Sequence, residues 1–92
     1  MIKEYCYLMY DGKYYKIGKS IHPQKRLKQF KTANPNIEIV AISKLVAEKD
    51  LHSLYKNKNI TLEWFDLTNE DVNEIKLLFK DGKAHIKLKQ MR

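Results

Sequence analysis

The sequence YYKIGKS at residues 14–20 decides the fold, together with the tyrosine-rich run EYCYLMYDG that comes before it. Residues 3–10 are aromatic and aliphatic, and Asp11-Gly12 then supplies a turn signal. A second β-prone run follows at residues 13–17. Two such runs joined by Asp-Gly predict a β-hairpin, in which the glycine of KIGKS ends the second strand.

A helix and a buried strand are predicted after the hairpin. The segment PQKRLKQFKTA begins at Pro23, a favoured first residue of helices, and places Leu27 and Phe30 three residues apart. The tripeptide NPN then ends this helix. The run IEIVAISKL at residues 37–45 is apolar on both faces of an extended chain, which predicts the central strand of the sheet.

The second half of the chain is expected to contribute two more helices around an extended segment. Residues 47–56 carry leucines on one side of a helix, and ITLEWFDL after them has the composition of a strand. Thr68 and Asp71 resemble a capping box at the start of a third helix, which Gly82 ends.

This order of elements, β-β-α-β-α-(β)-α, predicts an α/β (α+β) sandwich. Its centre is a three-stranded, mainly antiparallel sheet flanked by helices. A chain of 92 residues can bury one core but cannot easily divide into two, so residues 1–80 are expected to form a single domain. Residues 81–92 are expected to be a basic C-terminal tail or one short added strand.

The positive charge of the chain is concentrated in one segment. The formal net charge is +7, from 18 basic and 11 acidic residues, and no acidic residue lies between Asp11 and Glu38. This pattern favours a polyanion; nucleic acid ranks above a membrane surface, because Gly18 and Pro23 interrupt the segment. A basic surface that only keeps the protein soluble is the plain alternative. The lysines expected to contact DNA are Lys13, Lys19, Lys25, Lys28 and Lys31, and Lys16 and Arg26 are the other cations of the segment.

A single cysteine, Cys6, excludes an intramolecular disulfide and a zinc site built from cysteines. The N-terminus lacks the apolar region of a signal peptide, and no stretch reaches the roughly 18 apolar residues of a membrane span. These features predict an intracellular protein, cytoplasmic or, in a eukaryotic or viral host, nuclear, without membrane insertion. His22 and His85 have no companions at metal-ligand spacing and are expected at the surface.

A first strand with YCYL, a second with YYKIG and an arginine on a helix eight residues after the glycine together resemble the GIY-YIG nuclease superfamily. The later EKDLH and EWFDL narrow the resemblance to a phage and fungal branch with the pattern KIGKS…P.KRL……NP…E..LH…EWF, often described as a DNA-binding domain. The resemblance covers residues 5–67. It implies the fold described above and a DNA-directed activity.

The resemblance also implies roles for individual residues. Tyr7 matches the end of the first signature tripeptide, and Ile17 and Gly18 match the last two positions of the second. Arg26 resembles the arginine of the family's helix, and Glu63 its metal-binding glutamate. Two departures are present: Tyr5 stands where glycine is usual, and Lys16 stands where the superfamily has tyrosine, although lysine is usual in this branch.

The chemistry of phosphodiester cleavage suits these residue types. Tyr7 would be the general base, with Lys16 across the hairpin providing a field that favours its deprotonation. Arg26 would hold a nonbridging phosphate oxygen through its planar fork. Glu63 would bind a single divalent ion, Mg²⁺ or Mn²⁺.

His52 has two interpretations. It could act at the catalytic site by orienting a water or a phosphate, with Glu48 one turn earlier fixing its tautomer. It could instead be a half-buried helix histidine that pairs with that glutamate.

Three hypotheses for function follow. The first is a metal-dependent DNA endonuclease of GIY-YIG type that acts on double-stranded or branched DNA, with a homodimer possible. The second is a non-catalytic DNA-binding module on the same scaffold. The third is a small adaptor whose tyrosine-rich surface meets another protein. Salt dependence separates the last from the others, because phosphate contacts weaken steeply as salt rises.

Overall fold

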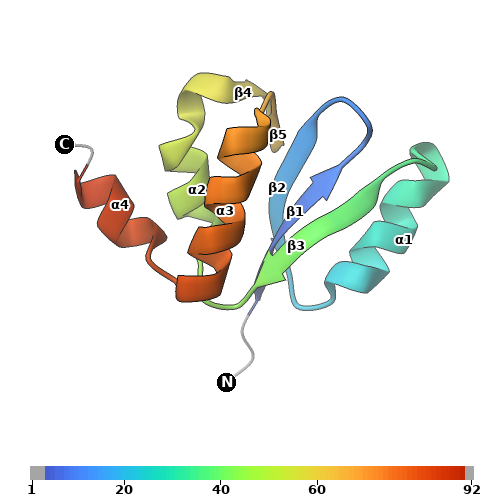
Figure 1. Ribbon diagram of the computed structural model, residues 1–92. Coiled ribbons are helices and arrows are strands. Elements are labelled where there is room, and N and C mark those ends of the chain that lie inside the picture. The colour runs from blue at the N-terminus through green and yellow to red at the C-terminus, as the bar shows by residue number, and fades with distance from the viewer. Residues whose placement is uncertain (1–3, 91–92) are drawn as a thin grey trace.

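The sheet is built from five antiparallel strands in the computed structural model, which describes residues 4–90 (Figure 1). The strands are β1 (Tyr5–Tyr10), β2 (Tyr15–Ser20), β3 (Glu38–Ser43), β4 (Asn59–Thr61) and β5 (Trp64–Phe65). Their order in the sheet is β3-β1-β2-β5-β4. The α+β class is confirmed, and the two strands beyond the expected three arise because ITLEWFDL folds back on itself as a short hairpin.

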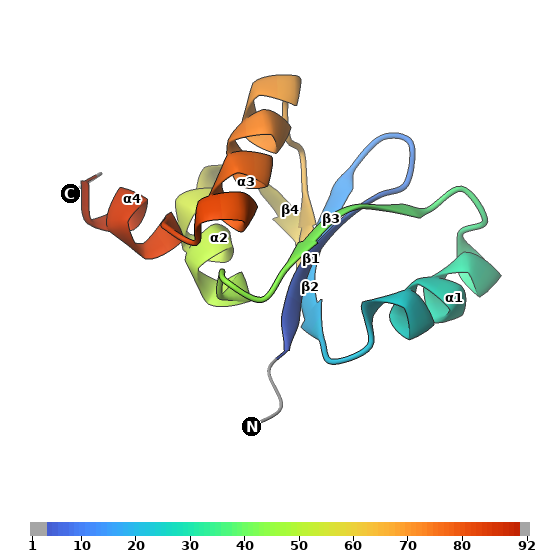
Figure 2. The same ribbon diagram turned by 60° about the horizontal axis from the view of Figure 1, so that its bottom comes forward.

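Helices cover both faces of this sheet. They are α1 (Pro23–Ala33), α2 (Glu48–Leu54), α3 (Asn69–Asp81) and α4 (Ala84–Gln90), with a 3₁₀ turn, η1 (Lys56–Lys58), after α2. In both views α1 lies alone on one face, and α2 and α3 lie together on the other (Figures 1 and 2). The sheet therefore has two chemically different sides.

The C-terminal segment is a helix, α4, and not the short strand considered from the sequence. It packs against α2, and its first residue, Ala84, is buried in the main core. Lys87, three residues later, forms an ion pair with Glu74 of α3. The spacing of Ala84 and Lys87 suits a helix that turns one side toward the domain.

The β1–β2 hairpin forms because Asp11 closes the turn. Its Oδ1 accepts hydrogen bonds from the backbone N–H groups of Lys13 (2.8 Å) and Tyr14 (2.7 Å). Gly12 has φ +105°, a conformation that side chains rarely adopt. The Asp-Gly signal thus acts through a side-chain hydrogen bond and a left-handed backbone, as expected.

Alternation along β1 divides the apolar residues into two clusters. Cys6 and Leu8 point toward α2 and α3, and belong to a main core of thirteen buried residues from the described chain. Tyr7 and Met9 point toward α1 and form, with Ile37, a much smaller α1-side cluster. The main core is made by Cys6, Leu8, Ile17, Val46, Leu51, Tyr55, Phe65, Leu67, Val72, Ile75, Leu78, Phe79 and Ala84.

The expectation that residues 37–45 form the central strand is wrong. β3 lies at an edge of the sheet, and β1, between β3 and β2, is the strand with four consecutive buried residues. Both faces of β3 are nevertheless packed, since Ile39 contacts the α1-side cluster and Val40 the main core. An apolar run indicates that both faces of a strand are buried, but it does not indicate whether both of its edges are paired with other strands.

The ends of α3 are as expected. Thr68 Oγ1 accepts a hydrogen bond from the Asp71 N–H (3.1 Å), and an Asp71 carboxylate oxygen accepts one from the Thr68 N–H (2.9 Å). Gly82 ends the helix in the left-handed conformation, with φ +72°. This capping box and the glycine fix the length of the helix that covers the main core.

Candidate functional site

Tyr7 is the buried centre of the α1 side of the sheet. Its side chain is 1% exposed, and in the β1–β2 register it stands opposite Gly18. A Cβ atom at Gly18 would overlap the Tyr7 hydroxyl group and ring. Gly18 therefore lies inside β2, where it makes room for the tyrosine, and does not end the strand as the sequence suggested.

Helix α1 brings an arginine and an aromatic ring to this tyrosine. The Phe30 ring meets the Tyr7 ring edge-on, with centroids 6.5 Å apart. The Arg26 guanidinium carbon lies 4.8 Å from the Phe30 ring centroid, and Nη1 donates a hydrogen bond to Gln29 Oε1 (3.1 Å). Arg26 is exposed, but its charge is close enough to favour ionisation of the Tyr7 hydroxyl.

Lys16 and Glu63 form an ion pair on the same side of the sheet. Lys16 Nζ lies 3.3 Å from Glu63 Oε1. The ammonium group also lies 4.9 Å from the Phe30 ring centroid and 5.2 Å from the Trp64 ring centroid. Because its side chain is only 14% exposed, Lys16 is held between two rings and a carboxylate. The Lys16 ammonium group therefore interacts directly with the Glu63 carboxylate.

Burial is the dominant influence on Tyr7. Burial first, and then the Glu63 and Glu48 carboxylates, together raise the pKa of Tyr7 to about 12, because Arg26 acts in the opposite direction without cancelling them. In the protein alone, the nearby cations therefore do not lower the pKa of the Tyr7 hydroxyl below its usual value, contrary to the expectation. At neutral pH the Tyr7 hydroxyl is protonated and can donate a hydrogen bond.

Glu63 offers a single carboxylate as a protein ligand for a divalent ion. It is 38% exposed, and an oxygen ligand of this kind suits Mg²⁺ or Mn²⁺. No group of three or more His, Cys, Asp or Glu side chains gathers within the described residues, and the Lys16 ammonium already faces Oε1. The chemistry of the donor therefore fits a cation that is bound through a single protein ligand.

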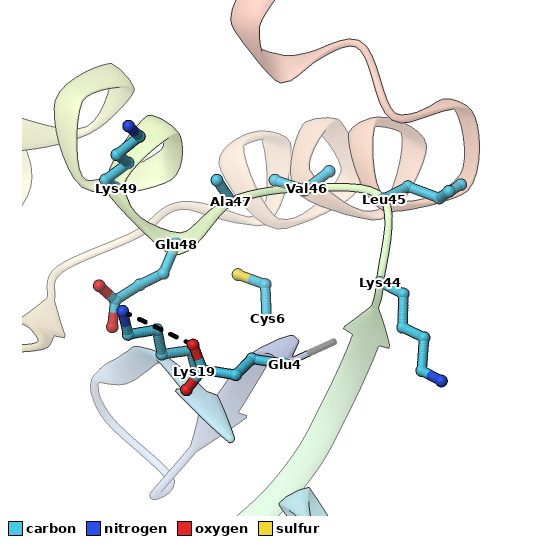
Figure 3. Close-up of a pocket in the computed structure, with 9 residues that line it drawn as sticks. All are labelled: Glu4, Cys6, Lys19, Lys44, Leu45, Val46, Ala47, Glu48 and Lys49. Carbon is cyan, nitrogen blue, oxygen red and sulfur yellow. Dashed lines mark ion pairs between the residues drawn. The ribbon is translucent and has the colours of Figure 1, made fainter. Parts of the chain in front are cut away.

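Glu48 is a second carboxylate that the sequence interpretation linked only to His52. It begins α2, and its charge also raises the Tyr7 pKa. It lines a cavity of about 580 Å³ with Cys6, and its side chain points toward Lys19 (Figure 3). The E..LH pattern was visible in the sequence, but the packing that brings its glutamate near Tyr7 was not.

His52 lies on the α2 side of the sheet and supports β2. Its Nε2 donates a hydrogen bond to the Ile17 carbonyl oxygen (2.9 Å), and its ring packs edge-on against Phe65 at 4.9 Å. The Ile17 N–H in turn donates to the Glu63 carbonyl oxygen (2.9 Å). In the described structure the hydrogen-bond partner of the ring is Ile17 and not Glu48, so the expected pairing with Glu48 is not seen. This hydrogen bond links α2 to the part of β2 beside Glu63.

The predicted DNA-contacting lysines are distributed over three places. The lysines of α1 are exposed on its outer side, while Lys13 lies at the hairpin turn over the Tyr14 ring, 5.1 Å from its centroid. Lys19 points to the opposite face of β2 and forms an ion pair with Glu4 (3.7 Å; Figure 3). Lys19 is thus separated from the α1 side. The exposed α1 lysines are Lys25, Lys28 and Lys31.

His22 precedes α1 and is exposed, as expected, and the side chain of His85 lies outside the described part of the chain. No described helix is long and apolar enough to cross a membrane.

A buried tyrosine beside an arginine, an ion-paired carboxylate and an exposed basic helix thus come together in one small α+β domain. A family model described as the T5orf172 domain matches residues 4–80. The chain therefore belongs to the T5orf172 domain family. No curated protein and no solved structure matches the chain.

Proposed function

We propose that this domain is a metal-dependent DNA endonuclease of the GIY-YIG type, which hydrolyses phosphodiester bonds. The observation that carries the proposal is the meeting of Tyr7, Arg26 and the Lys16–Glu63 pair on one side of the sheet. The exposed lysines of α1 flank this side and provide the attraction for a polyanionic strand. A domain that only bound DNA would gain nothing from a carboxylate at the phosphate.

Arg26 and Tyr7 would act on the phosphate in different ways. The Arg26 fork can donate two hydrogen bonds to nonbridging oxygens and stabilise the added negative charge of the transition state. The Tyr7 hydroxyl, held over Gly18, can align the attacking water; to act as the base it would first lose its own proton to solvent, and the phenolate would then take the proton of the water. The negative charge of a bound phosphate does not lower the pKa of Tyr7.

Glu63 would hold Mg²⁺ or Mn²⁺, whose positive charge would offset the carboxylate and polarise the phosphate. Lys16 is placed to keep the Glu63 side chain in one orientation. His52 is placed to keep the adjoining backbone fixed, through Ile17. Glu48 is the alternative carboxylate: it lies beside Lys19 and Cys6 on the other side of the sheet, but its charge also raises the Tyr7 pKa.

A non-catalytic DNA-binding module is the second candidate, and two observations favour it. The Tyr7 pKa is raised to about 12, which disfavours a base at neutral pH. Lys16 already neutralises Glu63 at 3.3 Å, so this carboxylate has less need of a metal. Both candidates use the same basic helix.

Nicking of supercoiled plasmid in Mg²⁺ or Mn²⁺, with an EDTA control, tests the proposal. Wild-type protein is expected to produce nicked circles before linear DNA, because one site cuts one strand at a time. Glu63→Gln is expected to abolish nicking and to keep plasmid binding. Glu70→Gln, which removes an exposed carboxylate from the first turn of α3, is the matched control and is expected to cut normally.

The other outcomes separate the candidates. Loss of nicking in Glu48→Gln with cutting retained in Glu63→Gln would move the metal-binding role to Glu48. Plasmid that is retarded but uncut by wild-type protein at every metal concentration would make the domain a binding module. In that case the catalytic roles of Tyr7 and Arg26 are withdrawn.

A further inference from the structure

A hollow of about 490 Å³ lies where the start of α1 meets the start of β1 and the end of β3. Its walls include Tyr5, Ile21 and Ile42, and its rim includes His22 and Lys25. Ligand pockets typically have volumes of roughly 300–1,000 Å³ and combine apolar walls with a few polar groups. This hollow has both properties.

The apolar walls of the hollow are exposed in the most basic part of the protein. Ile21 is 43% exposed and Ile42 is 39% exposed, and Tyr5 is only partly buried. Lys44 Nζ lies 4.8 Å from the Tyr5 ring centroid, so a cation already stands at this ring. Among the residues that the structure describes, no carboxylate lines the hollow. The combination suits a flat apolar group that is attached to an anion.

The hollow adjoins the Tyr7 site. Tyr5 and Tyr7 are two residues apart in β1, so they share a face of the sheet about 7 Å apart. Ile42 stands directly opposite Tyr7 in the β1–β3 register. A group seated between Tyr5 and Ile42 would therefore lie beside the Tyr7 backbone, one strand away from the Tyr7 hydroxyl, which lies over Gly18 of β2.

The start of α1 offers donors for a phosphate at the rim of this hollow. The helix is eleven residues long, begins with Pro23, and has no side-chain hydrogen bond at its N-cap, His22. The first N–H groups of such a helix are available to an anion, and the helix dipole favours negative charge there. Lys25, in the first turn, adds a positive charge at the same place.

We propose that this hollow binds one unpaired nucleobase of a DNA strand. The base stacks on the Tyr5 ring against Ile21 and Ile42, and an adjoining phosphate lies at the start of α1. The second half of the proposal is that the next phosphate along the strand lies at Tyr7 and Arg26. This half rests on the proposed function. The domain would then select DNA with a base displaced from the helix, at a bulge, a branch or a single-stranded end.

The test compares two labelled duplexes by fluorescence anisotropy in EDTA, so that binding is measured without cleavage. One duplex is fully paired, and the other carries a single bulged adenine. Wild-type protein is expected to bind the bulged duplex more tightly. Tyr5→Leu is expected to lower affinity for the bulged duplex about tenfold and to leave the paired duplex unchanged, because stacking of one base on an aromatic ring has that magnitude.

Tyr14→Leu is the matched control, because Tyr14 also has a lysine over its ring but lies at the hairpin turn. It is expected to retain the full preference for the bulge. Ile42→Gln tests the opposite wall from another strand and is expected to reduce the preference as Tyr5→Leu does. Thermal melts followed by circular dichroism identify any variant that has lost its fold.

Equal affinity of wild-type protein for the two duplexes would overturn the inference, and so would equal losses in Tyr5→Leu and Tyr14→Leu. These failures differ from failure of the proposed function. Plasmid nicking without a bulge preference would remove the base site and keep the nuclease. A bulge preference without nicking under any metal would keep the base site and remove the nuclease.

Discussion

The two sides of the sheet differ in how many apolar residues they bury and in what else they hold. On the α2 and α3 side, thirteen described residues form one contiguous core, and α3 alone contributes four of them. On the α1 side the buried cluster is Tyr7, Met9 and Ile37, and α1 buries only Pro23. The space that apolar residues leave is taken by Lys16, Arg26 and Glu63.

This difference shows how a domain of 92 residues accommodates a polar site. Buried area supplies most of the stability, and the main core concentrates it on one side. The other side can then hold the Tyr7 phenol, whose pKa is raised, and the partly buried Lys16–Glu63 ion pair, which contribute little to stability. We infer that stability and function are assigned to opposite faces of β1 and β2.

Truncation of neighbouring residues in β1 should test this assignment most strongly. Leu8 and Met9 are both 0% exposed but point to opposite sides. Leu8→Ala is expected to lower the free energy of unfolding by about 4–5 kcal/mol, and Met9→Ala by about 2 kcal/mol, because the smaller cluster can collapse around the lost volume. Urea unfolding measures both. Equal losses would mean that the two sides share the stability.

Alkaline pH should destabilise both sides through buried acids. Burial, with Glu48 and Asp50, raises the pKa of Cys6 to about 12, and burial, with Glu63, raises the pKa of Tyr7 to about 12. Both groups ionise earlier in the unfolded chain. Their contribution to stability is complete below the usual values, 9.0 and 10.0, and is lost as the pH rises toward 12.

Urea unfolding from neutral pH to about pH 11 measures this loss, which should reach about 1.4 kcal/mol for the tyrosine alone at that pH. Tyr7→Phe removes the phenol and is expected to flatten the upper part of the curve. Cys6→Ala is expected to flatten the part that begins at lower pH. A wild-type curve that both variants reproduce would show that neither group is shifted in the folded protein.

Gly18 should couple the hairpin backbone to the site. An added Cβ would overlap the Tyr7 hydroxyl, so Gly18→Ala is expected to displace the ring and to lower the free energy of unfolding by about 1–3 kcal/mol. The overlap disappears when the tyrosine is shortened. In a Tyr7→Leu background the same glycine substitution should therefore cost less than half as much. Additive losses in a double-mutant cycle would show that the two residues are independent.

Sequence reasoning reached the hairpin, α1, α2 and the two ends of α3, because each carries a local signal such as Asp-Gly, Pro23 or the capping box. It placed β3 at the centre of the sheet, since strand pairing depends on contacts between distant segments. It also missed the short β4–β5 hairpin and the helical state of α4. These elements depend on packing against distant parts of the chain, since β5 pairs with β2 and α4 packs against α2.

The candidate site was predictable as a set of residues and less so as a geometry. Tyr7, Gly18, Arg26 and Glu63 were identified, and the structure brings them to one side. Burial of the phenol, the Lys16–Glu63 pairing and the approach of the Glu48 charge could not be read from spacing, because they depend on which way each strand faces. For the same reason, the placement of Lys19 on the opposite face of β2 from the α1 side could not be read from the sequence.

The smallest expected effect concerns the turn beside Glu63. Leu62 has φ +49° and is 84% exposed, while Asn59 Nδ2 donates hydrogen bonds to the Leu62 (2.8 Å) and Trp64 (3.1 Å) carbonyl oxygens. The left-handed conformation costs a leucine energy that glycine avoids. Leu62→Gly is expected to raise the free energy of unfolding by about 0.5–1 kcal/mol.

A leucine-to-glycine substitution inside a helix is expected to change the free energy of unfolding in the opposite direction, and it serves as the control. Leu77 is 65% exposed inside α3, where glycine is a poor helix former, and Leu77→Gly is expected to lower the free energy of unfolding by about 1 kcal/mol. Urea unfolding compares the two. If both variants lose stability, the Leu62 turn is not strained, and the Asn59 hydrogen bonds alone hold its conformation. If Leu62→Gly gains stability while Leu77→Gly loses it, the left-handed conformation of Leu62 strains the turn beside Glu63.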